Sequence, residues 1–431
     1  MKKIEFYFLL ILAILQGNLM ATTIKYIDIK GVQIPVIFEE QKSLPILNLQ
    51  LVFQNSGYVQ DKDKSGLASL SSKLLNEGTK ELGASKFAEK LEENAISLTT
   101  SNGFETFVIE LSNLKEQSKK GINLLTELLK SPNYSKSTLE KLKTIQTGSL
   151  KRKENDFDYV SNNQLKSILF KGTTLQNPAS GTVESISKIK LKDIENFINQ
   201  TVCLENLIIV AGGDYELAEF EELVKPLLET LNVGKKLELE KIKFTSKKEE
   251  KELIKDTKQA YIYFGSSFNV DSKDEENYKA KVASFILGGS GFGSRLMEEI
   301  RVKRGLAYSA YGSISINKSY SYFNGYLQTK NESANEAKQL VTQLVEEFVN
   351  NGVTQEELTA AKNFLTGSEP LRSETLSQRL TNAFTLYYRG LEADYSKNEL
   401  EKIQNLELKD LNEYIKSHNE INNLTFSIVR K

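Results

Sequence analysis

Helical and strand-like periods of hydrophobic and polar residues alternate along most of the chain. One helical stretch, GLASLSSKLLNEGT, runs from Gly66 to Thr79. Its apolar positions follow the i, i+3, i+7, i+8 spacing: Leu67, Leu70, Leu74 and Leu75. Its other side carries polar residues: Ser69, Ser72, Lys73 and Asn76. The pattern predicts an amphipathic helix, with a polar face of no evident purpose.

Two segments of the chain recur at nearly the same interval. LKDIENFI from Leu191 returns as LKDLNEYI from Leu408, and LEKLKTIQTGS from Leu139 returns as LTAAKNFLTGS from Leu358, at offsets of 217 and 219 residues. Each half also opens with strand-like runs, moves into a helix and continues with another strand and amphipathic helices. The sequence therefore predicts two homologous α+β sandwich domains from an internal duplication.

The domain boundaries follow from this repeat and from a charged segment between the copies. We expect a leader over residues 1–21, a first domain over 22–234, a charged connector with room for one edge strand over 235–259 and a second domain over 260–431. The leader prediction rests on two lysines, an apolar run from Phe6 to Leu15 and Ala21. A signal peptide has this layout, whereas a membrane anchor needs ~20 apolar residues.

Composition narrows the classes of function. The net charge is −1, which gives no overall attraction to nucleic acid or to an anionic membrane. Cys203 is the single cysteine and His418 the single histidine, so neither a disulfide nor a histidine metal site is expected. Cys203 is predicted to be a buried apolar residue, and His418 to be solvated or to cap a helix.

The most distinctive stretch is GGSGFGSRLMEEIRVKRGLAYSAYG, from Gly288 to Gly312. It lacks the Gly-Lys-Ser/Thr ending of a phosphate-binding loop. Ser290 invites comparison with a hydrolase nucleophile, but Phe292 replaces the second glycine of a nucleophile elbow and no strand precedes it. A pairing of Ser290 with His418 stays open as a minor alternative.

This stretch closely resembles the second-domain signature of the pitrilysin/insulinase family of zinc peptidases, which includes the mitochondrial processing peptidases. The resemblance extends from about Thr23 to the C-terminus and includes GTVESISKIKLKDIENF from Gly181. It implies two homologous α+β domains that form half of a clam-like chamber. By motif position, Arg301 and Tyr308 would hold the carbonyl oxygens of a bound peptide, a task for which a guanidinium and a phenol are suited. The alternative is that Arg301 is an ordinary helix-surface residue and Tyr308 a core aromatic.

Active members of that family carry His-x-x-Glu-His on the helix that corresponds to Gly66–Thr79. Gly66 and the Gly-Thr pair at 78–79 match the frame of this motif, but the three ligand and base positions hold Ser69, Ser72 and Lys73. A third ligand, a glutamate, would fall near Gln146 to Leu150, where KTIQTGSL contains no carboxylate. The resemblance thus implies that this chain binds no zinc and has no catalytic residues of its own.

The resemblance also implies a partner. In two-chain members one chain carries the zinc and the other contributes the Arg/Tyr pair, and an extended peptide joins the sheet next to the zinc helix, here SLTTSNGFETFVIEL from Ser97. We expect an exported, periplasmic, non-catalytic subunit that pairs with a His-x-x-Glu-His chain, with no stable membrane span once the leader is removed. The alternatives are a peptide-binding or scaffolding protein without a peptidase partner, and peptide hydrolysis by non-zinc chemistry at Ser290.

Overall fold

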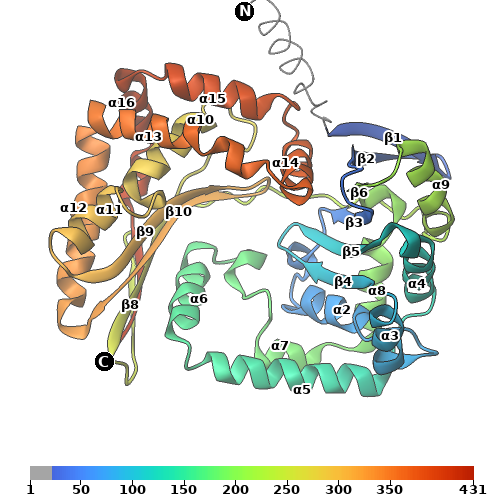
Figure 1. Ribbon diagram of the computed structural model, residues 1–431. Coiled ribbons are helices and arrows are strands. Elements are labelled where there is room, and N and C mark those ends of the chain that lie inside the picture. The colour runs from blue at the N-terminus through green and yellow to red at the C-terminus, as the bar shows by residue number, and fades with distance from the viewer. Residues whose placement is uncertain (1–21) are drawn as a thin grey trace, which may run out of the picture.

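The computed structural model describes residues 22–431, so the predicted leader lies outside the described residues. Within this range the chain forms two mixed halves, each built on one sheet (Figure 1). The predicted α+β class with two domains is confirmed.

The first half contains a six-stranded sheet in the order β1-β2-β6-β3-β5-β4. Its strands are β1 (Thr23–Ile29), β2 (Val32–Glu40), β3 (Ile46–Gln54), β4 (Ser97–Asn102), β5 (Thr106–Leu114) and β6 (Leu207–Gly213). Only the β2–β6 pair is parallel, and the other pairs are antiparallel. Strand β4 pairs with β5 alone, so it is one edge of the sheet.

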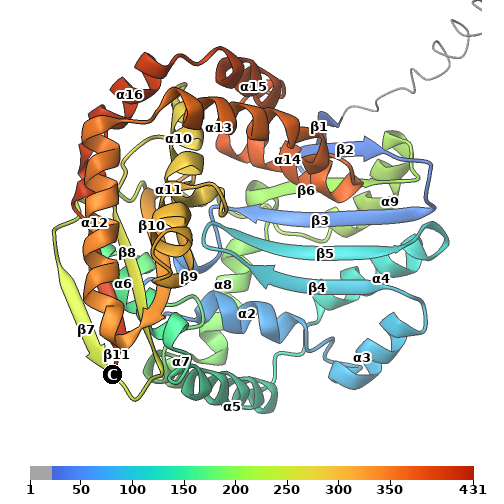
Figure 2. The same cartoon turned by 60° about the vertical axis from the view of Figure 1, so that its left-hand side comes forward.

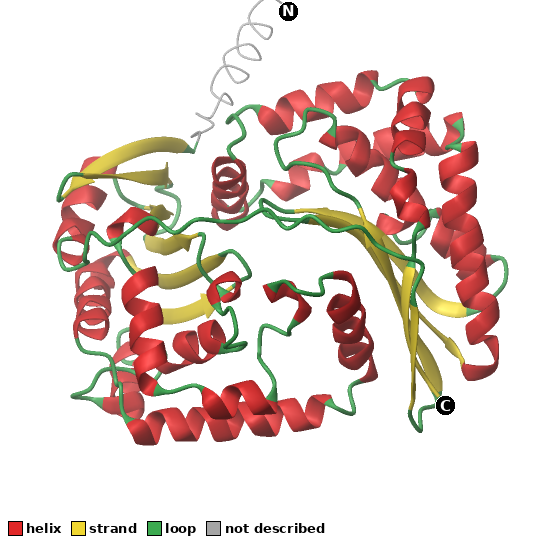
Figure 3. Ribbon diagram, turned by 180° about the vertical axis from the view of Figure 1, so that it is seen from behind, coloured by secondary structure: helices red, strands yellow, loops and turns green. Residues whose placement is uncertain are grey.

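The second half contains a five-stranded sheet in the order β7-β11-β8-β10-β9. Its strands are β7 (Glu250–Ile254), β8 (Gln259–Ser267), β9 (Ala307–Ile316), β10 (Ser321–Lys330) and β11 (Thr425–Arg430). Strand β7, which lies within residues 235–259, pairs in parallel with β11, and strand β9 forms the opposite edge. Figure 3 shows the long loop that precedes β7 and joins the two halves.

Helices cover the sheets on both sides. The first half contributes α2 (Leu67–Leu75), α3 (Gly83–Glu92), α4 (Ser118–Lys130), α5 (Lys136–Lys153), α6 (Phe157–Leu169), α7 (Val183–Lys188), α8 (Leu191–Thr201) and α9 (Leu217–Leu228). The second half contributes α10 (Asn277–Ser284), α11 (Arg295–Met297), α12 (Ala334–Asn351), α13 (Gln355–Gly367), α14 (Leu376–Arg389), α15 (Tyr395–Asn405) and α16 (Leu408–Ser417). The repeated LKD segments start α8 and α16, which lead into the interior strands β6 and β11 of the two sheets.

The two halves exchange one helix each. Helix α14, from the second half, packs on β2 and β6 of the first sheet (Figure 2). Leu376 and Leu380 belong to the same buried hydrophobic cluster as Val210. Helix α6, from the first half, packs on β8 and β11 of the second sheet (Figure 1). Each sheet thus has one face covered by its own helices and part of the other face covered by a helix from the other half.

A buried ion pair fixes one of these exchanged helices. Arg379 on α14 donates from Nε to Glu39 Oε1 on β2 at 2.8 Å, and Glu39 is only 2% exposed. Thr22 Oγ1 donates to the other carboxylate oxygen at 2.7 Å. Since a buried carboxylate is costly without partners, these contacts hold α14 firmly against the first sheet.

Candidate functional site

Helix α2 begins at a tightly constrained turn. Gly66 precedes it with φ of 91°, a conformation that favours glycine, and a Cβ there would lie 2.6 Å from Ile186 Cδ1. The buried Asp61 carboxylate accepts hydrogen bonds from Gly66 N at 2.7 Å and from Ala68 N at 2.8 Å. Burial raises the pKa of Asp61 to about 7, although these backbone donors oppose the shift. The Gly66 landmark therefore reflects a geometric need of the helix start.

The polar face of α2 docks the helix onto edge strand β4. Asn76 Nδ2 donates to Thr100 O at 2.9 Å, and Thr100 N donates to Asn76 Oδ1 at 2.7 Å. The buried Ser72 Oγ lies within hydrogen-bond distance of two acceptors, Ser69 O at 3.0 Å and Asn102 Oδ1 at 3.2 Å, and its single proton is donated to one of them at a time. The face that had no evident purpose in sequence therefore holds the helix beside the exposed edge of the sheet.

Lys73 contacts helix α5 through a neutral partner. Its Nζ donates to Gln146 Oε1, and Gln146 Nε2 in turn donates to Ser180 O at 2.8 Å. Lys73 has no carboxylate within 4 Å among residues 22–431. Burial, and secondarily the charge of Lys153, lower the pKa of Lys73. The segment expected to supply a third ligand thus does lie against α2, with an amide in place of a carboxylate.

The donor set around α2 does not suit a zinc ion. Hydroxyls, an amide and an ammonium replace the imidazoles and carboxylate that bind Zn²⁺, and the ammonium would repel a cation. Across residues 22–431, no three His, Cys, Asp or Glu side chains gather at a spacing that could hold a metal. No step of zinc chemistry can be derived from these residues.

Arg301 and Tyr308 lie together at the surface of the second half. Arg301 is in the π-helical turn Glu298–Val302 that follows α11, and Tyr308 is the second residue of edge strand β9. The Arg301 guanidinium lies 4.5 Å from the centroid of the Tyr308 ring, and Tyr308 is 81% exposed. The alternative that Tyr308 is a core aromatic is therefore wrong.

A third residue, Phe292, completes this cluster and was not singled out as a contact residue from the sequence. It is 71% exposed, and its ring centroid lies 4.7 Å from the Arg301 guanidinium. Phe292 comes from the glycine-rich loop between Gly291 and Gly293, both of which have positive φ. We call Phe292, Arg301 and Tyr308 the aromatic–arginine cluster.

Comparison with known proteins decides the family. The family model of insulinase (peptidase family M16) matches residues 36–183, and the model of the peptidase M16 inactive domain matches residues 188–365. A Helicobacter pylori protein described as "Non-peptidase homolog YmxG" is 44% identical over 425 residues, which cover 99% of this chain and 98% of that protein. The chain belongs to peptidase family M16.

Solved structures share the fold. A peptidase M16 inactive domain from Pseudomonas fluorescens superposes with a TM-score of 0.87 at 22% identity, covering 95% of this chain and 98% of that one. A protease from Helicobacter pylori superposes with a TM-score of 0.83 at 17% identity, covering 95% and 100%. These two structures show the fold, whereas the similarity to the non-peptidase homologue and the match to the inactive-domain model support a catalytically inactive M16-like protein.

Ser290 and His418 do not form a catalytic pair. Ser290 Oγ is buried without a hydrogen-bond partner. His418 lies at the end of α16, 4.5 Å from the ring of Phe268 between centroids, and its Nδ1 contacts Glu420 Oε1 at 2.9 Å. Within residues 22–431 the two side chains share no hydrogen bond, so His418 is not placed to activate this serine. Cys203 is fully buried, as predicted.

None of the helices that the structure describes is long and apolar enough to cross a bilayer.

Proposed function

We propose that this M16 chain is the exported, periplasmic, non-catalytic subunit of a zinc endopeptidase, and that it binds extended peptides for a partner chain that carries His-x-x-Glu-His. The observation that carries the proposal is the combination of an α2 helix without zinc ligands and a stacked pair of Arg301 and the exposed Tyr308. Cleavage would occur on the partner, which would supply the zinc. This chain would supply half of the chamber and part of the grip on the substrate.

Two features of the chain suit peptide binding. The aromatic–arginine cluster combines the guanidinium of the half-buried Arg301 with the phenol of the exposed Tyr308, and such donors bind backbone carbonyls without reading the side chains. Strand β4 is an unpaired edge, fixed by α2, to which an extended peptide can add as a further strand.

The similar proteins favour a partner in the same cell. Helicobacter pylori has a non-peptidase homologue 44% identical to this chain and also a protease of this fold only 17% identical to it. These identities separate the two as different proteins. One organism therefore contains both an inactive and a protease form, which is what a two-chain enzyme requires.

Affinity purification of the tagged full chain from its native cells tests the proposal. We expect a chain of similar length with His-x-x-Glu-His in near-equal amount, recovered from the periplasmic fraction. An Arg301→Ala chain should still capture this partner, since the cluster is assigned to peptide and not to assembly. Recovery of the chain alone, or with proteins that are not peptidases, would instead support the scaffolding alternative.

A further inference from the structure

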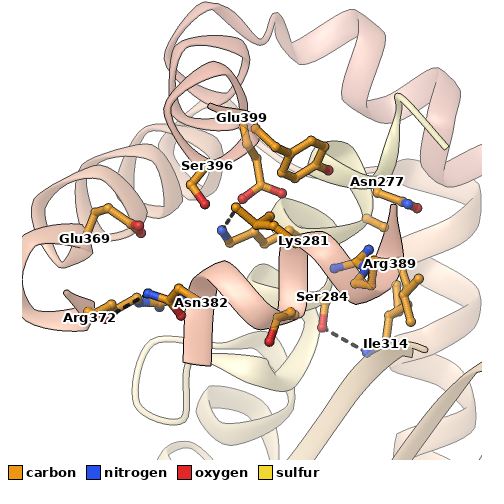
Figure 4. Close-up of a pocket in the computed structure, with 15 residues that line it drawn as sticks. Asn277, Lys281, Ser284, Ile314, Glu369, Arg372, Asn382, Arg389, Ser396 and Glu399 are labelled. Atoms are coloured by element: carbon orange, nitrogen blue, oxygen red, sulfur yellow. Dashed lines mark hydrogen bonds and ion pairs between the residues drawn. The ribbon is translucent and has the colours of Figure 1, made fainter. Parts of the chain in front are cut away.

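The second half contains a polar pocket that the proposed function does not use. It has a volume of about 360 Å³ and lies between α10, α14, α15 and the end of edge strand β9 (Figure 4). This volume is at the lower end of the ~300–1,000 Å³ typical of small-ligand sites. Its charged lining residues are Lys281, Glu369, Arg372, Arg389 and Glu399.

The position of the pocket follows from the duplication. Helix α10 occupies the place in the second half that α2 has in the first, next to an edge strand: Ile314 N on β9 donates to Ser284 Oγ on α10 at 2.9 Å, just as Ser72 on α2 contacts Asn102 on β4. Glu369 follows the repeated TGS segment and stands where the first copy has Leu150. The pocket is thus the counterpart, in the second domain, of the region around α2.

The charges of the pocket are only partly compensated. Lys281 Nζ pairs with Glu399 Oε2 at 2.5 Å. By contrast, the side chains of Arg372 and Arg389 make no ion pair among residues 22–431, and Arg389 donates only to Ser272 O, at 2.9 Å. Its Nε is buried without a partner. Three cationic and two anionic side chains therefore leave an excess of one positive charge.

The excess of one positive charge in the pocket favours a ligand with a single negative charge. An uncompensated guanidinium binds carboxylate or phosphate through paired N–H donors. Glu369 and Glu399 in the same lining would repel the higher charge of a phosphate, whereas a single carboxylate neutralises the excess. Apolar surface from Ile314 and Leu386 adds room for a short hydrocarbon part.

We propose that this pocket is a carboxylate-binding site, in which Arg389 holds one carboxylate group of a small molecule or of a peptide C-terminus, and Arg372, across the pocket, adds to the positive charge that attracts it. Figure 4 shows Arg372 and Glu369 on one side of the pocket, and Arg389 with Ser284 and Ile314 on the other. Glu369, which has no ion-pair partner among the described residues, is placed to accept an amino group of the same ligand. The inference does not depend on the proposed function.

Isothermal titration of the full chain with three probes tests the site: N-acetylalanine, tri-alanine with a free C-terminus, and tri-alanine amide. Saturable binding of both carboxylates, with at least tenfold weaker binding of the amide, is expected. Comparable affinity for N-acetylalanine and tri-alanine identifies small carboxylates as the ligand class, and a clear preference for tri-alanine identifies peptide ends. No saturable binding of either carboxylate, or equal binding of the amide, would overturn the proposal.

Matched variants locate the binding. Arg389→Gln should weaken tri-alanine binding about tenfold or more. Arg372→Gln, at an exposed position whose loss does not threaten folding, should weaken it several-fold. Arg152→Gln, an exposed arginine on α5, should leave it unchanged. Binding that persists in both pocket variants would contradict the assignment to this site.

Discussion

The guanidinium of Arg301 lies 4.5 Å from the centroid of the Tyr308 ring, on a surface where Tyr308 is 81% exposed. A stacked pair with so exposed a ring contributes little to the core, since an aromatic ring adds to stability mainly when it is buried. Stacking instead limits the orientations of the guanidinium, so its donors are preorganised for a ligand. This contact is the basis of the peptide-binding proposal.

Replacing Arg301 by lysine should weaken peptide binding about tenfold, because lysine keeps the charge but loses the planar donor fork that stacks on the rings. Fluorescence anisotropy with an unstructured labelled peptide measures the change. Arg304→Lys is the matched control, since Arg304 lies three residues away and pairs with Glu299 instead of the rings. Equal losses in the two variants would point to general electrostatics and not to the cluster.

Phe292→Ala should also reduce peptide affinity, by several-fold, because it removes one of the two rings next to Arg301. The free energy of unfolding should change by less than about 0.5 kcal/mol, as is usual for exposed positions. The same anisotropy assay and a urea titration separate the two effects. A large loss of stability with no loss of binding would show that Phe292 has a structural role.

Wild-type chain should take up no zinc when equilibrated with the metal, because its α2 face offers hydroxyls and an ammonium. Two redesigned chains combine Ser69→His, Ser72→Glu and Lys73→His with a fourth substitution on α5, which is Gln146→Glu in one chain and Leu150→Glu in the other. At least one of the two should take up zinc in a one-to-one ratio. Elemental analysis after gel filtration measures the metal. Equal zinc in wild-type and redesigned chains would contradict this account of α2.

Asp61 predicts a dependence of stability on pH. Its pKa is raised to about 7 in the folded chain, against 3.8 as its ordinary value. Between these values the folded chain keeps a proton that the unfolded chain has lost, so this group lowers the free energy of unfolding as pH rises from about 4 to 7. Asp61→Asn should flatten that part of the profile in urea titrations. A slope unchanged by the substitution would assign the titration to another group.

The packing of the exchanged helix α14 on the first sheet should depend on the buried ion pair between Arg379 and Glu39. Glu39 is 2% exposed and Arg379 is partly exposed, so Arg379→Met should lower the free energy of unfolding by about 3 kcal/mol by leaving a buried carboxylate with fewer partners. The double variant Arg379→Met with Glu39→Gln should recover part of this loss. Additive losses in the double variant would show that the two side chains are not coupled.

The duplication and the main elements could be predicted from the sequence because they rest on local patterns: repeated segments, helical spacing around Leu70 and landmark glycines such as Gly66. The exchange of α6 and α14 between the two halves could not be predicted from the sequence. Amphipathic spacing shows that Leu376 and Leu380 face a core, but not which sheet supplies it, because that choice depends on contacts between residues more than 150 positions apart.

In the candidate site, too, some features could be predicted from the sequence and others could not. Ser69, Ser72 and Lys73 stand at the positions of a motif with fixed spacing, so the sequence alone could identify them as the zinc-site positions. The place of Phe292 beside Arg301 depends on a π-helical turn and a loop with two positive-φ glycines, and neither has a clear sequence signature. The contact of Lys73 with Gln146 likewise requires the packing of α5 on α2.

The most direct measurement of the central claim is the rate at which the His-x-x-Glu-His partner hydrolyses an unstructured peptide as this chain is titrated in. The account predicts no hydrolysis by this chain alone, a saturable increase in the rate of the mixture near equal amounts, and a much smaller increase with Arg301→Ala. A partner that is fully active alone, with a rate that neither wild-type nor Arg301→Ala chain changes, would contradict it.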